Sequence, residues 1–338
     1  MEALDSEIIN AVPILTSLRA QLQTFAISPS VFLSRSQTNS QNNQPEPSIA
    51  NQNEKPQGIH EDVLPKILQL LGIRSMTLNS RHDLDPLANF SVDIPQSASK
   101  QYQWQYIRSR GLIQELQSLF QNCRIIAFND WSKLAAASDL WTGLLTDVIK
   151  PIEKKDLEFI FYLGDPQKKL SFQVDEVLDI ISDFSYYGQV TFALNEGEAI
   201  NLWRVLNGVH LNTPVTVQGY SDLKRKYVSI FQTMNIARLL IYSANNAILF
   251  TKLEQFVLAH ERVTSTIEMA TDARLHFIKG FSIGLIHQLD MPRCLALGLI
   301  VFGSYGERRT SPDRKDLIAY INRWIDDLQQ SETMPHYQ

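Results

Sequence analysis

The sequence predicts an α/β fold in which a mostly parallel β-sheet is covered by helices on both faces. After Cys123, short apolar runs alternate along the chain with segments of helical periodicity. Short apolar runs separated by helices are typical of parallel strands that are buried on both faces. A chain of 338 residues, of which 44% are hydrophobic and 20% charged, is long enough to bury such a core.

The expected elements follow one another closely after Cys123. We expect strands at 124–128, 157–163, 189–194, 214–217 and 237–242. We expect helices between them at 130–149, 175–187, 196–206 and 221–234. Ahead of this region, helical periodicity favours a short helix at 63–71, closed by a glycine, and a longer helix at 97–122.

The following region fits two interpretations. Apolar residues from Leu249 to Phe281 fit one long helical seam. The same residues fit strands at 248–251 and 256–259, followed by a helix that starts near Ala273. Periodicity alone does not choose between the helix and the hairpin.

The last helix has clear start signals. Ser311 is suited to the N-cap, Pro312 to the first turn, and Asp313 complements the helix dipole. Apolar residues then recur on one face through Trp324. The pattern predicts a C-terminal helix that packs against the main body.

The composition divides the chain into three parts. Residues 1–33 form a helical segment whose apolar repeat is interrupted by Pro13. Residues 34–58 are rich in Ser, Gln, Asn and Pro, and we expect a disordered linker there. Residues 59–330 form the main domain. The first segment is either a helix packed on that domain or a tethered helix that docks on a partner.

Charge and cysteine content exclude several classes of protein. A net charge of −5 gives no attraction to nucleic acid or to an anionic membrane. The 2 cysteines predict a reducing compartment without a disulfide framework. No apolar run reaches the roughly 18–20 residues that span a bilayer, and an acidic N-terminus argues against a signal peptide. We expect a cytoplasmic protein.

Motifs in the second half resemble one family of enzymes. Residues 271–277 read TDARLHF and are followed by Gly280 and Phe281. This segment resembles the signature T-G-A-G-D-x-F-x-x-G-F of the ribokinase-like (PfkB) carbohydrate kinases. Further matches, in the family's order, are RIIAFNDW at 124–131, GDPQKK at 164–169, LNEGEA at 194–199 and Ser-Pro at 311–312. The resemblance runs from about Leu112 to Trp324.

This resemblance implies a ribokinase-like three-layer sandwich, and it favours the hairpin over the long helix. Kinases of this family carry a small β lid and a Gly-Gly sequence that contacts the sugar. The chain has no Gly-Gly, and its first 110 residues contain only two glycines, Gly58 and Gly72. A remnant strand is expected at 73–78. The sugar site therefore looks lost, and the lid is expected to be reduced or absent.

The family's catalytic chemistry is missing from the signature. Its two glycines bring backbone N–H groups to the transferring phosphate, and its aspartate takes the proton from the sugar hydroxyl. Asp272 and Arg274 stand at the glycine positions, on either side of Ala273, and Leu275 stands at the aspartate position. Leucine cannot accept a proton, whereas the guanidinium of Arg274 can bind an anion. The resemblance thus implies that residues 272–274 are a vestigial phosphate or anion loop.

Three further residues are candidates for a magnesium or phosphate site. By family match, Asn195 and Glu198 help to organise Mg²⁺ and phosphate, and Asp165 follows the preceding strand. The alternative is structural, because Asn195 and Glu198 have the spacing of a helix capping box.

The sequence therefore predicts a non-catalytic relative of these kinases that acts as a regulatory or scaffold protein, with a protein partner and no certain cofactor. One alternative is an active carbohydrate or nucleoside kinase that uses ATP and Mg²⁺ and takes its base from Asp272 or Asp165. Another is a sensor that binds nucleotide without turnover.

Overall fold

The computed structural model describes most of the chain outside the N-terminal quarter. The described residues are 6–24, 31–33, 68, 71, 73–78, 104–109, 111–128, 131–134, 136–209, 220–243, 246–259, 271–308, 310 and 312–333. The linker predicted at 34–58 and the strand predicted at 214–217 lie outside them, as does most of the helix predicted at 63–71.

One mixed sheet forms the centre of the fold. The described residues form a 9-stranded sheet in the order β1-β9-β8-β7-β6-β5-β4-β3-β2. Strands β4, β5, β6 and β7 run parallel in its middle, and β2, β3 and β8 are antiparallel to their neighbours. Their bounds are β1 Ser6–Ile8, β2 Val31–Leu33, β3 Ile73–Leu78, β4 Cys123–Phe128, β5 Leu157–Tyr162, β6 Gly188–Asn195, β7 Arg238–Tyr242, β8 Asn246–Thr251 and β9 Gln255–Ala259. Every strand among the described residues belongs to this sheet, so these residues contain no separate lid.

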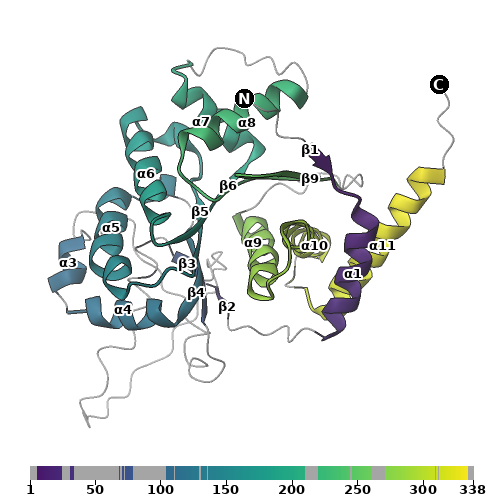
Figure 1. Cartoon of the computed structure of the whole chain (residues 1–338), viewed down its shortest axis with the longest axis horizontal. Coiled ribbons are helices and arrows are strands. Elements are labelled where there is room, and N and C mark those ends of the chain that lie inside the picture. Colours follow the sequence, from purple (N-terminus) through teal and green to yellow (C-terminus); the bar gives the residue numbers. More distant parts are fainter. Residues whose placement is uncertain are drawn as a thin grey trace, which may run out of the picture.

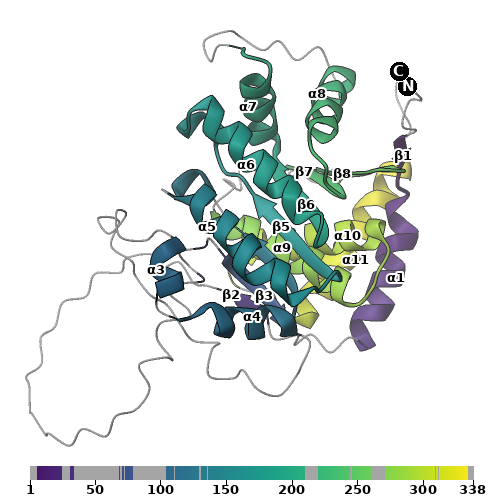
Figure 2. The ribbon, with the colours of Figure 1, turned by 60° about the vertical axis from the view of Figure 1, so that its left-hand side comes forward.

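Helices cover both faces of the sheet, as Figure 1 and the rotated view in Figure 2 show. On one face lie α3 (Trp104–Ser109), α4 (Ile113–Asn122), α5 (Ala137–Leu144), α6 (Ser171–Phe184), α7 (Glu196–Leu206) and α8 (Tyr220–Thr233). On the other lie α1 (Ala11–Thr24), α9 (Thr271–Ile286), α10 (Met291–Arg308) and α11 (Arg314–Thr333). The architecture is therefore the expected three-layer sandwich.

Aromatic side chains fill the core between the sheet and α5 and α6. The ring of Phe161 stacks on Phe128 at 4.4 Å between centroids. It also meets Trp141 edge-on at 5.2 Å and Phe184 at 5.1 Å. All four side chains are fully buried. Offset and edge-to-face ring pairs of this kind add to the stabilisation from apolar burial.

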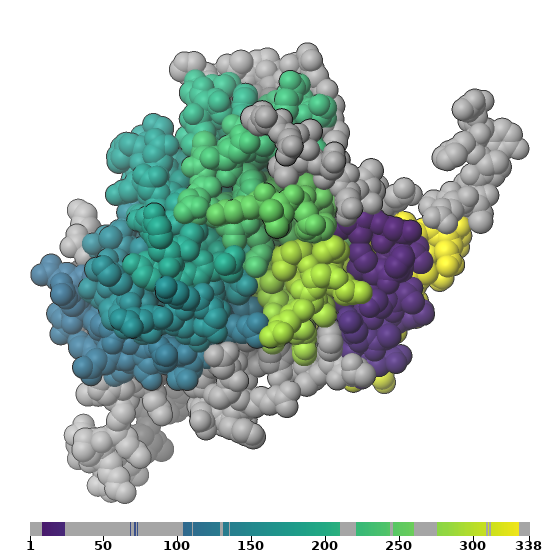
Figure 3. All heavy atoms as spheres, in the orientation of Figure 1, coloured from purple at the N-terminus to yellow at the C-terminus, as the bar shows by residue number. Residues whose placement is uncertain are grey.

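The N-terminal segment is part of the same body. Strand β1 pairs in parallel with β9, and α1 lies against α10 and α11, where Figure 3 shows it beside the C-terminal helix. Leu15 and Leu18 of α1 are completely buried. Arg19 donates to the side-chain oxygen of Asn322 at 2.9 Å. Of the two interpretations left open, the structure contains the packed helix.

The hairpin interpretation is confirmed, because β8 and β9 are antiparallel neighbours and α9 follows them. The strands expected at 124–128, 157–163, 189–194, 237–242 and 73–78 are also present, as are the helices expected at 196–206 and 221–234. The helix expected at 175–187 begins earlier, at Ser171, and ends at Phe184.

Three expectations about helices were wrong. The helix at 97–122 is interrupted between α3 and α4, where Gly111 adopts a φ of +71° that disfavours other residues. The helix at 130–149 is broken into a 3-10 turn, α5 and a π-helical turn. The N-cap of α11 is not Ser311. The Asp313 carboxylate instead accepts the Asp316 N–H at 2.9 Å, which holds the pKa of Asp313 below its usual value.

None of the described helices is long and apolar enough to cross a membrane.

Candidate functional site

The candidate residues gather at the carboxyl edge of the parallel strands. Asn195 is the last residue of β6, and Asp165 lies just beyond the end of β5. Because β5 and β6 are parallel neighbours, their ends lie side by side. Crevices outside the carboxyl ends of strands are where open α/β sheets bind ligands. The structure thus brings together residues that are distant in sequence.

Asn195 and Glu198 are engaged with each other's backbone. The Asn195 side-chain oxygen accepts the Glu198 N–H at 2.8 Å, and a Glu198 carboxylate oxygen accepts the Asn195 N–H at 3.0 Å. Glu198 is only 5% exposed. This reciprocal pair is a capping box at the start of α7. The structural alternative for these two residues is therefore present in the fold.

Asp165 has a similar local role. Its carboxylate accepts the Gln167 N–H at 3.1 Å and so caps a single 3-10 turn, Pro166–Lys168. No group of three or more His, Cys, Asp or Glu suited to a metal occurs among the described residues. The oxygens of Asp165 and of the capping pair would have to hold Mg²⁺ from positions in which they already accept backbone hydrogen bonds.

Lys169 adds a cation to this edge that the sequence analysis did not single out. Its Nζ donates to the Leu134 carbonyl at 2.8 Å and lies 5.4 Å from the centre of the Trp131 ring. Burial lowers the pKa of Lys169. The signal was available, because Lys169 closes the GDPQKK segment that carries the family resemblance. The net charge at this edge is thus less negative than Asp165 and Glu198 alone would make it.

Helix α9 begins at the same edge. The ring of Phe277, near its start, stacks on Tyr242 at the carboxyl end of β7, with 5.1 Å between centroids. Near its other end, Gly284 packs against Cys294, whose pKa is raised by burial and is also influenced by Arg238 and Glu158 near the amino ends of β7 and β5. The helix therefore runs from the carboxyl edge of the sheet to the amino edge.

The signature residues occupy the first turns of α9. The backbone of 271–275 is helical from its first residue. Asp272, Ala273, Arg274 and Leu275 therefore stand at the N-terminus of the helix that follows the hairpin. Backbone N–H groups at such a position favour anions.

Aromatic side chains cover the sheet beneath that N-terminus. Tyr162 and Tyr242 meet edge-on at 6.2 Å, and Phe277 stacks on Tyr242 from α9. These three side chains are at most 2% exposed. Protein rings therefore fill the layer between the sheet and the start of α9.

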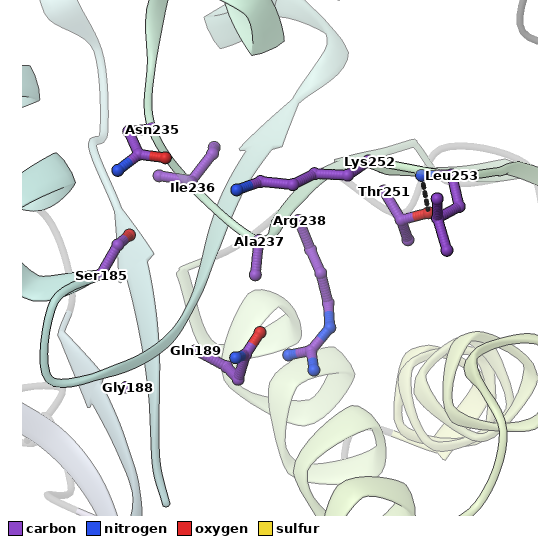
Figure 4. Close-up of a pocket in the computed structure, with 10 residues that line it drawn as sticks. All are labelled: Ser185, Gly188, Gln189, Asn235, Ile236, Ala237, Arg238, Thr251, Lys252 and Leu253. Atoms are coloured by element: carbon purple, nitrogen blue, oxygen red, sulfur yellow. Dashed lines mark hydrogen bonds between the residues drawn. The ribbon is translucent and has the colours of Figure 1, made fainter. Parts of the chain in front are cut away.

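A cleft opens at the opposite edge of the sheet, away from all of these candidates. Its volume is about 430 Å³. Figure 4 shows its lining, which comes from the end of α6, the starts of β6 and β7, and the turn between β8 and β9. The lining residues are Ser185, Gly188, Gln189, Asn235, Ile236, Ala237, Arg238, Thr251, Lys252 and Leu253. Sequence reasoning assigned none of them to a site, since they carry no motif.

Comparison with protein families gives a match over most of the chain. Residues 93–324 match the family described as prokaryotic ketohexokinase. The chain belongs to this family. The predicted relationship to ribokinase-like (PfkB) carbohydrate kinases is confirmed, and the layered fold agrees with it. A comparison with curated proteins found no match.

Solved structures of kinases show a more distant similarity. Adenosine kinase of Trypanosoma brucei brucei is 13% identical, with a TM-score of 0.44 over 60% of this chain and 56% of that one. Adenosine kinase of Anopheles gambiae, in complex with P1,P4-di(adenosine-5) tetraphosphate, is 15% identical, with a TM-score of 0.43 over 62% and 57%. Ribokinase of Thermotoga maritima is 14% identical, with a TM-score of 0.37 over 49% and 50%. The chain spans little more than half the length of the adenosine kinases.

Proposed function

We propose that this member of the ketohexokinase family does not transfer phosphate and acts instead as a regulatory or scaffold protein. The observation that carries the proposal is Leu275. It occupies the catalytic base position of the family signature, within the first turns of α9. An aliphatic side chain has no group that can take the proton of a sugar hydroxyl.

The size of the expected loss supports the proposal. A general base is typically worth about 10²–10⁴-fold in rate. Removing one preorganised hydrogen-bond donor to the developing charge typically lowers the rate by about 10²–10³-fold. Asp272, at the first glycine position, brings negative charge toward a phosphate, and Arg274, at the second, adds bulk where backbone must approach. Losing both kinds of contribution leaves little catalysis.

The contacts of Asp165 and Glu198 at this edge favour a structural role for these carboxylates over that of a relocated base. Asp165 caps the turn after β5, and Glu198 is held in the capping box of α7. Each is a structural acceptor of a backbone N–H group. A relocated base would have to give up such a hydrogen bond or come from Asp272.

A direct test measures ADP release from ATP and Mg²⁺ in the presence of ketohexoses, aldohexoses and nucleosides. We expect no release above the rate without acceptor. Acceptor-dependent release that disappears in Asp272→Asn or Asp165→Asn, but persists in the control Asp179→Asn on the exposed face of α6, would establish the active kinase instead.

Nucleotide binding is measured separately from turnover. Thermal unfolding of the full chain is followed with millimolar ATP and Mg²⁺. An unchanged melting temperature would exclude both alternatives, the active kinase and the nucleotide sensor. A clear rise without turnover supports the sensor, and its loss in Arg274→Ala would place the nucleotide at the first turns of α9.

A binding role is supported by exposed apolar side chains next to this edge. Leu170 and Phe172, at the start of α6, are each 62% exposed. Large exposed apolar groups that lie together are more frequent at interaction sites than elsewhere. They follow Lys169 directly, so a partner bound there would also cover the candidate edge.

The partner is sought with the tagged full chain, because removing residues 1–58 would uncover the apolar surface that α1 buries. We expect a stoichiometric partner that is lost in Leu170→Ser/Phe172→Ser and retained in Tyr186→Ser, whose ring is 69% exposed at the other end of α6. A chain that elutes alone, or a partner that all variants retain, would contradict this surface.

A further inference from the structure

We propose that the cleft at the amino edge of the sheet binds a small phosphorylated molecule, of the size of a sugar phosphate. The cleft lies at the opposite edge of the sheet from Asp165, Asn195 and the start of α9, so the proposal is independent of whether the chain transfers phosphate. It rests on the shape of the cleft, on its charge, and on a buried hydroxyl group within it.

The backbone around the cleft is fixed by close contacts. Gly188 opens β6 where a side chain would place its Cβ only 2.3 Å from the Leu157 carbonyl oxygen. On the other side, the Thr251 hydroxyl accepts the N–H groups of Leu253 at 3.3 Å and Glu254 at 2.9 Å. These bonds hold the turn that carries Lys252. The cleft is thus bounded by rigid elements, as preformed binding sites are.

The charged side chains that line the cleft are both cationic. Arg238 is already paired, since its two terminal nitrogens lie 2.7 and 3.3 Å from the Glu158 carboxylate. Lys252 forms no ion pair with any described residue, and Figure 4 shows its side chain reaching across the cleft toward Asn235 and Ile236. Among the described residues, the lining of the cleft therefore offers one uncompensated positive charge and no carboxylate.

Hydrogen-bond donors accompany this charge. The Ser185 hydroxyl is buried at the end of α6 and bonds to no described protein group. The amide side chains of Gln189 and Asn235 line the same space. A buried hydroxyl without a partner is unfavourable unless something else satisfies it. A ligand that accepts hydrogen bonds from Ser185, the amides and Lys252 would supply that partner.

The donor set favours a phosphate over a carboxylate. Planar carboxylates are best recognised by a free guanidinium fork. The fork of Arg238 is occupied by Glu158. A lysine ammonium is a point charge that suits the tetrahedral phosphate group. A volume of about 430 Å³ also leaves room for a polar body attached to the phosphate, because ligand pockets typically measure about 300–1,000 Å³.

Calorimetric titration of the full chain tests the proposal, with glucose 6-phosphate, inorganic phosphate, glucose and citrate as probes. We expect glucose 6-phosphate to bind more tightly than inorganic phosphate, and glucose and citrate to give no binding. Lys252→Ala should weaken glucose 6-phosphate by about tenfold or more, and Ser185→Ala by about threefold. Lys155→Ala is the matched control, because Lys155 is an exposed lysine that precedes β5 at the same edge.

Each other outcome overturns the proposal. If titration with millimolar glucose 6-phosphate gives no heat of binding, the cleft is not a binding site for it. If wild type, Lys252→Ala and Lys155→Ala bind glucose 6-phosphate equally, the ligand binds outside this cleft, for example at the carboxyl edge of the sheet. Binding of citrate in preference to glucose 6-phosphate, or equal binding of glucose, removes the phosphate assignment.

Discussion

Replacement of Gly280 by alanine tests how α9 is held in place. Helices α9 and α10 approach so closely at this residue that an added Cβ would lie 2.4 Å from the Leu297 carbonyl oxygen and 2.9 Å from the Gly298 Cα. Both obstructing atoms belong to the backbone, so no side-chain rotation relieves the clash. An ordinary contact needs about 3.5 Å, so the helices would have to separate by about 1 Å.

The expected cost follows from two opposing contributions. Alanine is favoured over glycine inside a helix by about 1 kcal/mol. Overpacking in a core costs typically about 1–3 kcal/mol, and here the obstruction is backbone at an interface in which Gly284 and Gly298 are also in close contact. Because backbone atoms cannot rotate away, we expect the clash to cost about 2–3 kcal/mol, at the upper end of that range. After the gain of about 1 kcal/mol from helix propensity, Gly280→Ala should lower the free energy of unfolding by about 1–2 kcal/mol.

Urea unfolding, followed by circular dichroism and tryptophan fluorescence together, measures this free energy. Ser282→Ala is the control, because it lies on the same helix, is buried, and removes a hydroxyl group that bonds to no described group. We expect it to leave the stability unchanged or to raise it. If Gly280→Ala is as stable as wild type or more so, the close approach of α9 and α10 is refuted.

Two further perturbations address the capping box and the thiols. Asn195→Ala removes the oxygen that caps α7 and should cost about 1 kcal/mol in urea unfolding, and an unchanged midpoint would contradict a capping role. Burial raises the pKa values of Cys123 and Cys294 to about 12, against about 8.5 in an unfolded chain. The folded thiols stay protonated, so the free energy of unfolding should fall as the pH rises above about 9, where the unfolded thiols ionise. A thiol reagent at pH 8 should label both cysteines only in denaturant, and labelling of the native chain would contradict their burial.

Much of the fold was accessible from local sequence. Continuous apolar runs predicted β4 to β7, because strands buried on both faces need apolar residues throughout. The capping-box spacing of Asn195 and Glu198 predicted the start of α7, because its hydrogen bonds link residues only three positions apart. The signature at 271–277 placed the start of α9 after a hairpin, although periodicity alone also fitted one long helix.

Local helix signals were less reliable where several residues compete for the same role. Ser311 and Asp313 are both good N-cap residues, and the sequence favoured the first. The chain begins α11 at Arg314, with Asp313 and Asp316 bonded to each other's backbone N–H groups. The break at Gly111 was missed for a different reason, because the apolar periodicity of the sequence continues across it.

The sequence by itself indicated the family, the strands β4 to β7 with most of the helices between them, and the leucine at position 275 of the signature, because these depend on residue identity and on spacing along the chain. Only the tertiary structure decided that β1 joins the far end of the sheet beside β9 and that α1 packs on α11. It also decided that Lys169 reaches Leu134 and that Arg238 pairs with Glu158, leaving Lys252 as the uncompensated charge of the amino-edge cleft. These contacts join residues that are far apart in sequence, and their partners are selected by the packing of the whole molecule, which no local pattern records.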